Sequence, residues 1–339
     1  MVSMKESSKT PLLPVSDSGS GSSKKSPTMT KKGAFAAISY MACAVLLVIF
    51  NKAAISSYNF PSANVITLFQ MLFSCLFLYA LRFWKIISFT SDGKLGLNNH
   101  PAKLVPLKTI IHTLPLTISY LFYMVISMES IRGINVPMYT ALRRTTVAFT
   151  MMMEYILLGQ KHSPYFVGSV GTIILGAFIA GARDLSFDFY GYSIVILSNI
   201  TNAINLACIA QTGKSSGLNS FGLMWCTGIT CGPILLIWAF FSGELETTMN
   251  FPYLYSYGFQ AVMFLSCVVA FLLNYTVFLN TTVNSALTQS ICGNLKDLFT
   301  IGFGWILFGG LPFDLLNVVG QSLGFLGSGL CAYCKLKGK

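Results

Sequence analysis

Six charged side chains fall inside long apolar stretches, where charge is costly. The basic ones are Lys52, Arg143, Arg144 and Lys296, and the acidic ones are Glu154 and Asp297. A charge at the centre of a hydrocarbon layer costs about 2.5 kcal/mol or more, so such residues normally face a water-filled cavity or an opposite charge. The excess of basic residues predicts a cavity for an anion, and phosphate groups suit both arginine and lysine.

The fourth apolar stretch carries both arginines. Tyr139 lies four residues before Arg143, and Thr140 lies four before Arg144, so the two members of each pair share a helical face. Glu154 comes eleven residues after Arg143 and returns to the same stripe after about three turns. Adjacent arginines point about 100° apart, so one can anchor the bundle while the other faces a ligand. Glu154 can alternatively neutralise an arginine on a neighbouring helix.

The ninth apolar stretch is polar for a membrane span and contains Gly293-Asn294 just before Lys296-Asp297. A glycine at this point lets a ligand or another backbone approach closely. Lys296 offers three hydrogen-bond donors to a phosphate. The alternative is a structural ion pair between Lys296 and either Asp297 or Glu154.

Further candidates lie in the first stretch and among the aromatic residues. Lys52 follows Asn51 in the middle of the first run, where it either faces the cavity or snorkels to the lumenal interface. Tyr139 and Tyr275 can stack on a base or bond a sugar hydroxyl. The predicted binding residues are therefore Asn51, Lys52, Tyr139, Arg143, Arg144, Tyr275, Gly293, Asn294 and Lys296.

The composition predicts the elements that position these residues. The chain is 54% hydrophobic and only 10% charged, with a mean hydropathy of +0.66. These values indicate an all-α polytopic membrane protein in a lipid bilayer. At about 20 residues per crossing, the chain accommodates roughly ten transmembrane helices. The predicted segments are 33–56, 62–83, 107–128, 135–157, 164–182, 190–212, 219–242, 257–280, 284–309 and 312–334.

Charge predicts the orientation of these spans. With ten spans both termini lie on one side, and the loops on that side hold most of the lysines. Outside the spans, the opposite side holds only Arg132 and Arg183 as basic residues. The positive-inside rule therefore predicts cytosolic termini. Five spans in each half also suggest an inverted repeat with one central site.

Three regions follow from these boundaries. Residues 1–32 are rich in Ser, Lys, Gly and Pro and are interpreted as a disordered cytosolic tail. Residues 33–334 form the ten-helix domain, and residues 335–339 form a short basic tail. The first region can alternatively be a transit peptide, although it contains no arginine.

Several other functions are not supported by the residues present. The three histidines lack metal-ligand spacing, and no phosphate-binding Walker loop occurs, so we expect no metal, no cofactor and no enzyme. The net charge of +11 is interpreted as topology signal, not as nucleic-acid binding. The CxxC formed by Cys331 and Cys334 lacks a second pair. Gly320 and Gly324 form a GxxxG that predicts helix packing.

Three motifs, in order, resemble those of nucleotide-sugar transporters in the drug/metabolite transporter superfamily. They are Phe50-Asn51-Lys52 with Phe60-Pro61-Ser62, Val136 to Arg144 with Glu154, and Asn284 to Thr288 with Gly293 to Asp297. The second is similar to the fourth span of the solute carrier 35 subfamily that carries UDP-sugars. The resemblance covers nearly all of residues 33–334.

The resemblance implies exchange of a cytosolic nucleotide sugar for a lumenal nucleoside monophosphate. It further implies that Lys296 and the ninth-span backbone hold phosphate while the seventh span reads the base. GDP-mannose transporters carry Gly-Ala-Leu-Asn-Lys and Phe-Tyr-Asn-Asn at these places. This chain instead has Gly293 to Asp297 and Met224 to Thr227, which favours a UDP-sugar, and among those an N-acetylhexosamine.

Other functions stay open as alternatives. These are GDP-mannose/GMP exchange and a plastid sugar-phosphate/phosphate translocator. An enzyme acting on lipid-linked sugars would need clustered acidic residues or histidines, and a receptor would not need four intramembrane cations. Lys335-Leu-Lys337-Gly-Lys339 fits either coat-protein recognition or an ordinary basic flank. We expect a Golgi membrane protein, with residence in the ER and a homodimer also considered.

Overall fold

The described part of the computed structural model consists of helices joined by short connections. It covers residues 29–54, 58–90, 105–130, 136–181, 189–308 and 315–337. The helices are α1 (Lys31–Lys52), α2 (Ala63–Phe83), α3 (Leu107–His112), α4 (Leu114–Ser130), α5 (Val136–Arg143), α6 (Thr146–Leu158), α7 (Pro164–Gly181), α8 (Phe189–Ser215), α9 (Ser220–Phe241), α10 (Glu244–Met249), α11 (Tyr257–Val283), α12 (Ala286–Phe308) and α13 (Leu315–Lys337). Among these residues β pairing is limited to a single bridge between Thr90 and Leu218. The expected all-α class is confirmed.

The predicted segments correspond to these helices with three differences. The third segment is divided into α3 and α4 at Thr113, and the fourth into α5 and α6 after Arg143. A short helix, α10, follows α9 and was not predicted. Within the described residues, six helices are long and apolar enough to cross a membrane. A polytopic membrane protein is thereby confirmed, while the count of ten crossings stays a prediction.

Helix boundaries follow from local capping chemistry. The Thr30 hydroxyl accepts a hydrogen bond from Gly33 N at 3.1 Å, and the Asn219 side chain accepts one from Gly222 N at 2.9 Å. Such side chains satisfy amide groups that a first helical turn leaves free. At the C-terminal end of α6, Gly159 takes a left-handed conformation with φ of 63°. Glycine adopts this conformation without strain and ends the helix.

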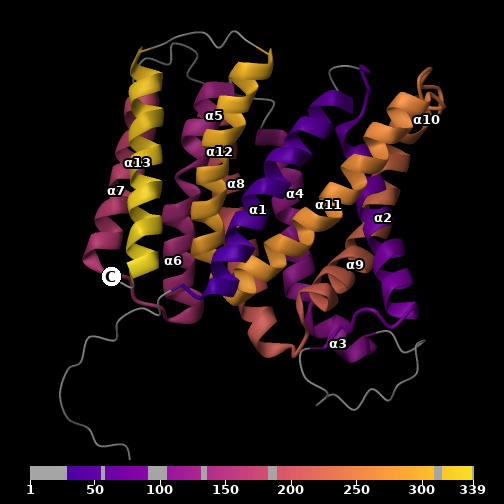
Figure 1. Cartoon of the computed structure of the whole chain (residues 1–339), viewed down its shortest axis with the longest axis horizontal. Coiled ribbons are helices and arrows are strands. Elements are labelled where there is room, and N and C mark those ends of the chain that lie inside the picture. The colour runs from indigo at the N-terminus through magenta and orange to yellow at the C-terminus, as the bar shows by residue number, and fades with distance from the viewer. Residues whose placement is uncertain are drawn as a thin grey trace, which may run out of the picture.

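The helices form two groups that lie side by side (Figure 1). The first, called here the six-helix group, contains α1, α2, α4, α8, α9 and α11 together with short α3 and α10. The second, called the four-span group, contains the divided span α5/α6 with α7, α12 and α13. Contacts of α1 with α12, and of α6 with α8, join the two groups.

The packing pattern agrees with a five-plus-five repeat. For this comparison α3/α4 and α5/α6 each count as one span, so that α8 corresponds to α1, α9 to α2, and α11 to α4. Replacing each span by its counterpart converts the packed pair α1–α11 into the pair α8–α4. The same exchange converts α1–α12 into α8–α6 and leaves α2–α9 and α7–α13 unchanged. All of these pairs pack in the structure. An odd repeat unit inverts its direction on duplication, as expected from the charge pattern.

The GxxxG of the last span brings α13 close to α7. A Cβ on Gly320 would lie 2.5 Å from the Gly176 carbonyl oxygen, so only glycine permits this approach. A Cβ on Gly324 would lie 2.9 Å from an Arg144 nitrogen, so this second glycine makes room for a side chain. The predicted packing role of the motif is confirmed.

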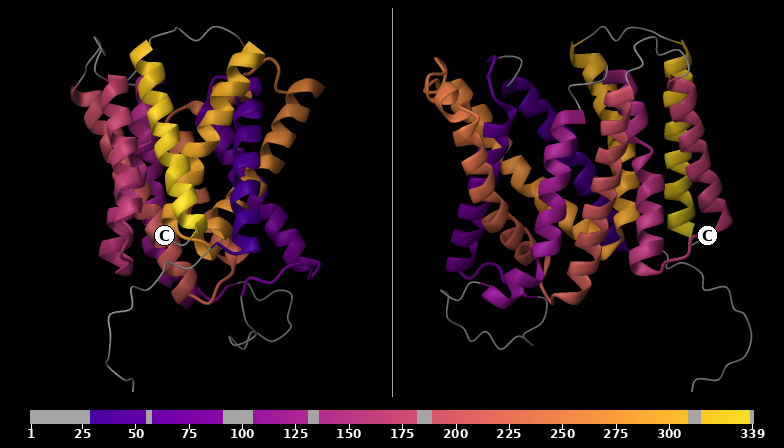
Figure 2. Two further views of the ribbon diagram at one scale, coloured as in Figure 1. Left: turned by 60° about the vertical axis from the view of Figure 1, so that its left-hand side comes forward. Right: turned by 180° about the vertical axis from the view of Figure 1, so that it is seen from behind.

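Both described ends of the chain lie at the same end of the bundle (Figure 2). We call it the terminal end; it carries the start of α1 and the end of α13. The predicted tail of residues 1–32 falls mostly outside the described residues, although α1 already begins at Lys31. Lys335 and Lys337 belong to the last turn of α13.

Candidate functional site

The fourth span is interrupted halfway, between Arg143 and Thr146. Three backbone carbonyls near the break receive side-chain donors. Asn199 of α8 donates to Leu142 O at 2.9 Å, and Thr146 donates to Arg143 O at 2.6 Å. Asn294 of α12 donates to Arg144 O at 3.1 Å. Polar partners of this kind allow irregular backbone inside a membrane protein, and broken helices commonly mark transport sites.

Arg143 points from the end of α5 toward the six-helix group. Its guanidinium donates to the hydroxyl of Tyr139 on the same helix and to that of Tyr123 on α4, the latter at 3.0 Å. It also interacts electrostatically with Asp297 of α12. The predicted pairing of Tyr139 with Arg143 is confirmed, and the second tyrosine comes from another helix.

Lys296 and Asp297 form an ion pair with a separation of 2.7 Å between Nζ and Oδ1. Their side chains retain 23% and 19% of their exposure, so both are only partly buried. Four residues earlier than Asp297, Gly293 faces α1, where a Cβ would lie 3.6 Å from the Tyr40 hydroxyl. Tyr40 itself interacts electrostatically with both Asp297 and Arg143.

These residues form one site, called here the central cluster: Tyr40, Tyr123, Tyr139, Arg143, Gly293, Lys296 and Asp297. Tyr40 and Tyr123 belong to the six-helix group, and the other members belong to the four-span group. Gly293 and Asp297 lie about two and three turns into α12, or roughly 11 to 17 Å, close to half the thickness of a bilayer core. The cluster therefore occupies the interface between the groups near mid-depth, where transporters commonly place a substrate.

Arg144 points away from Arg143 and is almost completely buried, with 2% exposure. Its guanidinium donates to Gln321 O of α13 at 2.7 Å and lies 3.7 Å from the centre of the Phe325 ring. It interacts electrostatically with Asp297 as well. These contacts anchor the broken span to α13, on the side of the span away from Arg143.

Two predicted asparagines bond to other protein groups. Asn294 is buried and uses its amide on Arg144 O, as described above. The side-chain oxygen of Asn51 accepts hydrogen bonds from Gln70 of α2 at 3.0 Å and from Ser266 of α11 at 2.7 Å. Asn51 therefore ties α1 to its neighbours within the six-helix group, outside the central cluster.

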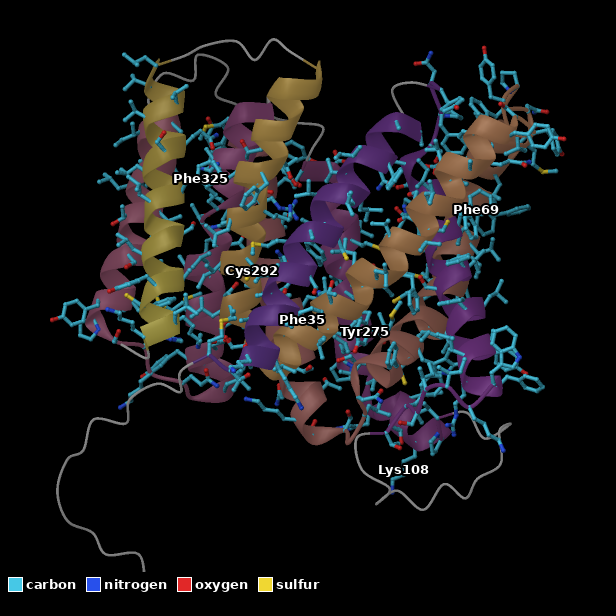
Figure 3. All side chains as sticks on the ribbon, in the orientation of Figure 1. Phe35, Phe69, Lys108, Tyr275, Cys292 and Phe325 are labelled. Carbon is cyan, nitrogen blue, oxygen red and sulfur yellow. The ribbon has the colours of Figure 1, made fainter. Side chains whose placement is uncertain are left out.

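Two predicted binding residues remain, Lys52 and Tyr275. The Lys52 side chain lies outside the described part of the structure, so its role stays a prediction. Tyr275 stacks on Phe221 of α9 with 4.4 Å between ring centres and packs beside an apolar core. In Figure 3 it lies nearer the terminal end than Cys292 of α12 does, and it does not join the central cluster.

Glu154 does not share a site with Arg143, contrary to the stripe expected of an unbroken helix. Glu154 Oε1 instead accepts a hydrogen bond from Leu287 N, at the start of α12, at 2.8 Å. Its second oxygen lies 3.8 Å from His162 Nε2. Burial, together with the charge of Lys335, lowers the pKa of His162 and keeps this ring neutral near pH 7. Glu154 therefore caps α12.

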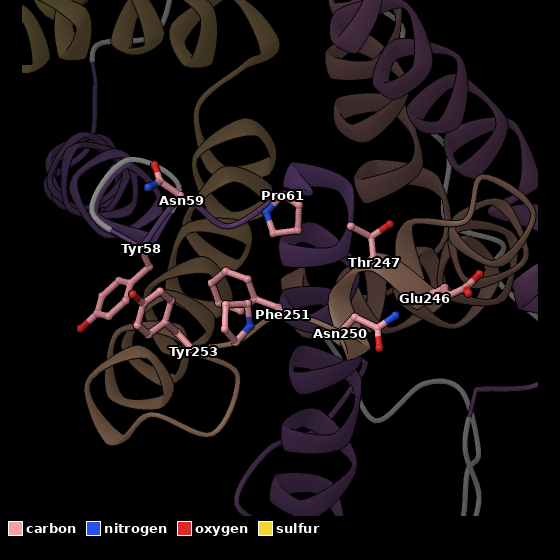
Figure 4. A pocket seen from close by; sticks show the side chains of 9 residues that line it. Tyr58, Asn59, Pro61, Glu246, Thr247, Asn250, Phe251 and Tyr253 are labelled. Carbon is pink, nitrogen blue, oxygen red and sulfur yellow. The ribbon is translucent and has the colours of Figure 1, made fainter.

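A surface hollow of about 550 Å³ lies at the end of the bundle opposite the termini. Figure 4 shows its lining, which includes Tyr58, Tyr253, Asn59 and Asn250. Glu246 is its one charged lining residue and is acidic. A hollow without basic side chains does not suit phosphate, so the central cluster is the better candidate for an anion site.

Sequence reasoning missed Tyr40 and Tyr123 and treated Asp297 only as a partner of Lys296. Both tyrosines lie in apolar helices and share no spacing motif with the charged residues. A hydroxyl inside a span is a weak signal, since the chain has 15 tyrosines. Only their convergence on Arg143 and Gly293 sets these two apart.

Comparison with known proteins points the same way. Residues 31–332 match the Triose-phosphate Transporter family. A UDP-N-acetylglucosamine transporter of Arabidopsis thaliana is 64% identical, over 97% of this chain and 99% of its own length. A nucleotide sugar transporter of Mus musculus is 32% identical over 85% of this chain and 84% of its own length. A GDP-mannose transporter of Arabidopsis thaliana is 25% identical over 88% of this chain and 86% of its own length. A solved crystal structure, 11% identical, aligns with a TM-score of 0.59 over 91% of this chain and 98% of its own and supports the fold.

Proposed function

Because the chain belongs to the triose-phosphate transporter family, within the drug/metabolite transporter superfamily, we propose that it is a nucleotide-sugar antiporter. It imports a UDP-sugar, either UDP-N-acetylglucosamine or UDP-N-acetylgalactosamine, into the Golgi lumen in exchange for UMP. The central cluster carries this proposal, because it gathers Lys296 and Arg143 around Asp297 at the interface of the two helix groups. The Arabidopsis relative named for UDP-N-acetylglucosamine supports the choice of base and sugar.

In this mechanism Lys296 and Arg143 hold the diphosphate of the entering substrate. The lysine contributes a compact charge with three donors, and the arginine contributes a planar fork oriented by two tyrosine hydroxyls. Gly293 leaves space for the ligand beside α12. The six-helix and four-span groups then rock about the bound anion, so that the site opens alternately to each side.

The orientation follows the distribution of charge. The terminal end, which carries Lys108, Lys161, Lys214 and Lys335, faces the cytosol in this proposal. Nucleotide sugars enter from that side, and UMP returns to it. The basic C-terminal residues are available there for recognition by coat proteins, which fits residence in the Golgi with retrieval to the ER.

Uptake into proteoliposomes tests the proposal. Vesicles containing the purified protein are preloaded with UMP, GMP or phosphate and offered radiolabelled UDP-N-acetylglucosamine, GDP-mannose or triose phosphate. We expect uptake of UDP-N-acetylglucosamine driven by internal UMP. The variant Lys296→Ala should lower it by about tenfold or more, since a charge-assisted contact contributes about 1.5–3 kcal/mol.

The matched control is Lys108→Ala, which removes an exposed lysine of α3 at the terminal end and should leave uptake unchanged (Figure 3). Exchange of GDP-mannose for GMP would replace the uridine assignment. Phosphate-driven uptake of a sugar phosphate, without uptake of any nucleotide sugar, would replace the whole proposal.

A further inference from the structure

Asp297 interacts with all three cations described around the broken fourth span. It bonds Lys296 at 2.7 Å and interacts electrostatically with both Arg143 and Arg144. Glu154 also lies in a span, but it is committed to Leu287 N in the first turn of α12. Among the described side chains, the charge of the cavity is therefore set by three cations and Asp297.

We propose that Asp297 adjusts the cavity to a substrate with two negative charges, and that it thereby selects nucleotide sugars with an uncharged sugar over those with a uronic acid. Arg143 and Lys296 at the cluster, with Arg144 buried behind them, give three positive charges against the one negative charge of Asp297, a net charge of +2 around the bound anion. The diphosphate of a UDP-sugar carries about two negative charges at neutral pH, and so does a nucleoside monophosphate. Both sides of the exchange therefore neutralise the cavity. This inference rests on the proposed function.

A uronic acid adds a third negative charge that this cavity does not match. The unmatched charge is costly because a membrane interior solvates it poorly. Asp297 also repels any carboxylate placed near the phosphates, because like charges interact strongly where water is scarce. Removing the Asp297 charge would raise the cavity to +3 and favour the more acidic substrate.

The geometry leaves room for both an anion and Asp297. Lys296 has three donors and uses one on Asp297, so two remain for phosphate oxygens. The partial exposure of both side chains keeps Asp297 next to the space that the substrate fills. Asp297 is thus a specificity-determining residue and not only a structural partner of the lysine.

The test compares UDP-glucose with UDP-glucuronate, which differ by one carboxylate. Each competes against radiolabelled UDP-N-acetylglucosamine for uptake into UMP-loaded proteoliposomes. In the natural protein we expect UDP-glucuronate to be weaker by about tenfold or more, which is the size of effect that one unmatched charge produces at low dielectric. Asp297→Asn should reduce this ratio to about threefold or less, and Asp297→Glu should preserve it.

Glu246→Gln is the charge-matched control, because Glu246 is exposed on α10 at the opposite end of the bundle. It should leave the ratio unchanged. For a variant that folds but does not transport, the preference is measured by comparing the rise in melting temperature with UDP-glucose to the rise with UDP-glucuronate. Should Asp297→Asn fail to fold, the natural protein still decides, since equal competition by the two sugars overturns the inference.

The outcomes separate this inference from the proposed function. Exchange of UDP-N-acetylglucosamine for UMP with an unchanged ratio in Asp297→Asn overturns the role of Asp297 and leaves the transporter assignment intact. Absence of any uptake of a UDP-sugar by the natural protein overturns the transporter assignment, and the charge-matching inference falls with it.

Discussion

Arg143 and Arg144 are adjacent in the sequence but lie in different environments, because α5 ends at Arg143. Arg143 reaches Tyr123 across the interface of the two helix groups, whereas Arg144 is enclosed by Gln321 and Phe325 of α13. The same residue type therefore serves one position that contacts substrate in our proposal and one position that holds helices together.

This division predicts different defects for the two arginines. Arg143→Gln should lower nucleotide-sugar uptake by about tenfold or more, because a charged contact with phosphate contributes about 1.5–3 kcal/mol, and should leave the melting temperature almost unchanged. Arg144→Gln should destabilise the fold by about 1–3 kcal/mol, since the Gln321 carbonyl loses its donor. Uptake and thermal unfolding of the purified variants in detergent measure the two effects. A larger loss of thermal stability in the Arg143 variant would contradict the assignment.

Among the elements, α12 has the most connections within the site. Its first turn is capped by Glu154 of α6, its middle supplies Gly293, Lys296 and Asp297, and Asn294 supports the break in the fourth span. The spans that line the cluster are thus held to one another by polar side chains, not only by apolar packing. Movement of α12 would transmit directly to α6.

The cap on α12 gives a prediction about stability. Glu154→Ala removes the acceptor of Leu287 N and should destabilise the protein by about 0.5–2 kcal/mol, as other lost N-caps do. Glu154→Gln keeps a side-chain oxygen in place and should be milder. Scanning fluorimetry of both variants provides the measurement. Equal loss in the two variants would indicate that charge, and not the hydrogen bond, is what matters at this position.

At the scale of the whole molecule, the net positive cluster explains why exchange should be coupled. An empty cavity carries charge without a matching anion, and reorienting it through the membrane interior is unfavourable. A bound nucleotide removes this barrier in either direction. In our proposal, the two helix groups therefore move only when an anion occupies the interface.

Coupled exchange predicts that UMP inside the vesicle stimulates uptake of the nucleotide sugar from outside. Uptake of labelled UDP-N-acetylglucosamine by UMP-loaded proteoliposomes should exceed uptake by empty ones by about tenfold or more, because the unpaired charge costs at least about 2.5 kcal/mol. The initial rates at equal protein content are the quantities to compare. Equal rates with and without internal UMP would show that the empty carrier reorients freely.

Local sequence patterns were sufficient to predict most of the helices and several of the residues in the candidate site. The apolar runs predicted the helices, because each run must bury itself in lipid or in protein wherever the remainder of the chain lies. Residues out of place in such runs, above all Arg143 and Lys296, marked the site for the same reason. The pairing of Tyr139 with Arg143 was predictable because it depends only on helical spacing.

The break after Arg143 could not be read from local spacing, because it depends on donors from distant helices. Asn199 of α8 and Asn294 of α12 supply hydrogen bonds to the carbonyls near the break, and the sequence between residues 136 and 158 contains no sign of either. Glu154, which the spacing placed on the stripe of Arg143, instead caps α12. What the sequence determined by itself was therefore the apolar helices and the surplus of basic residues inside them. Which charges meet was decided by tertiary structure, because long-range hydrogen bonds override helical periodicity.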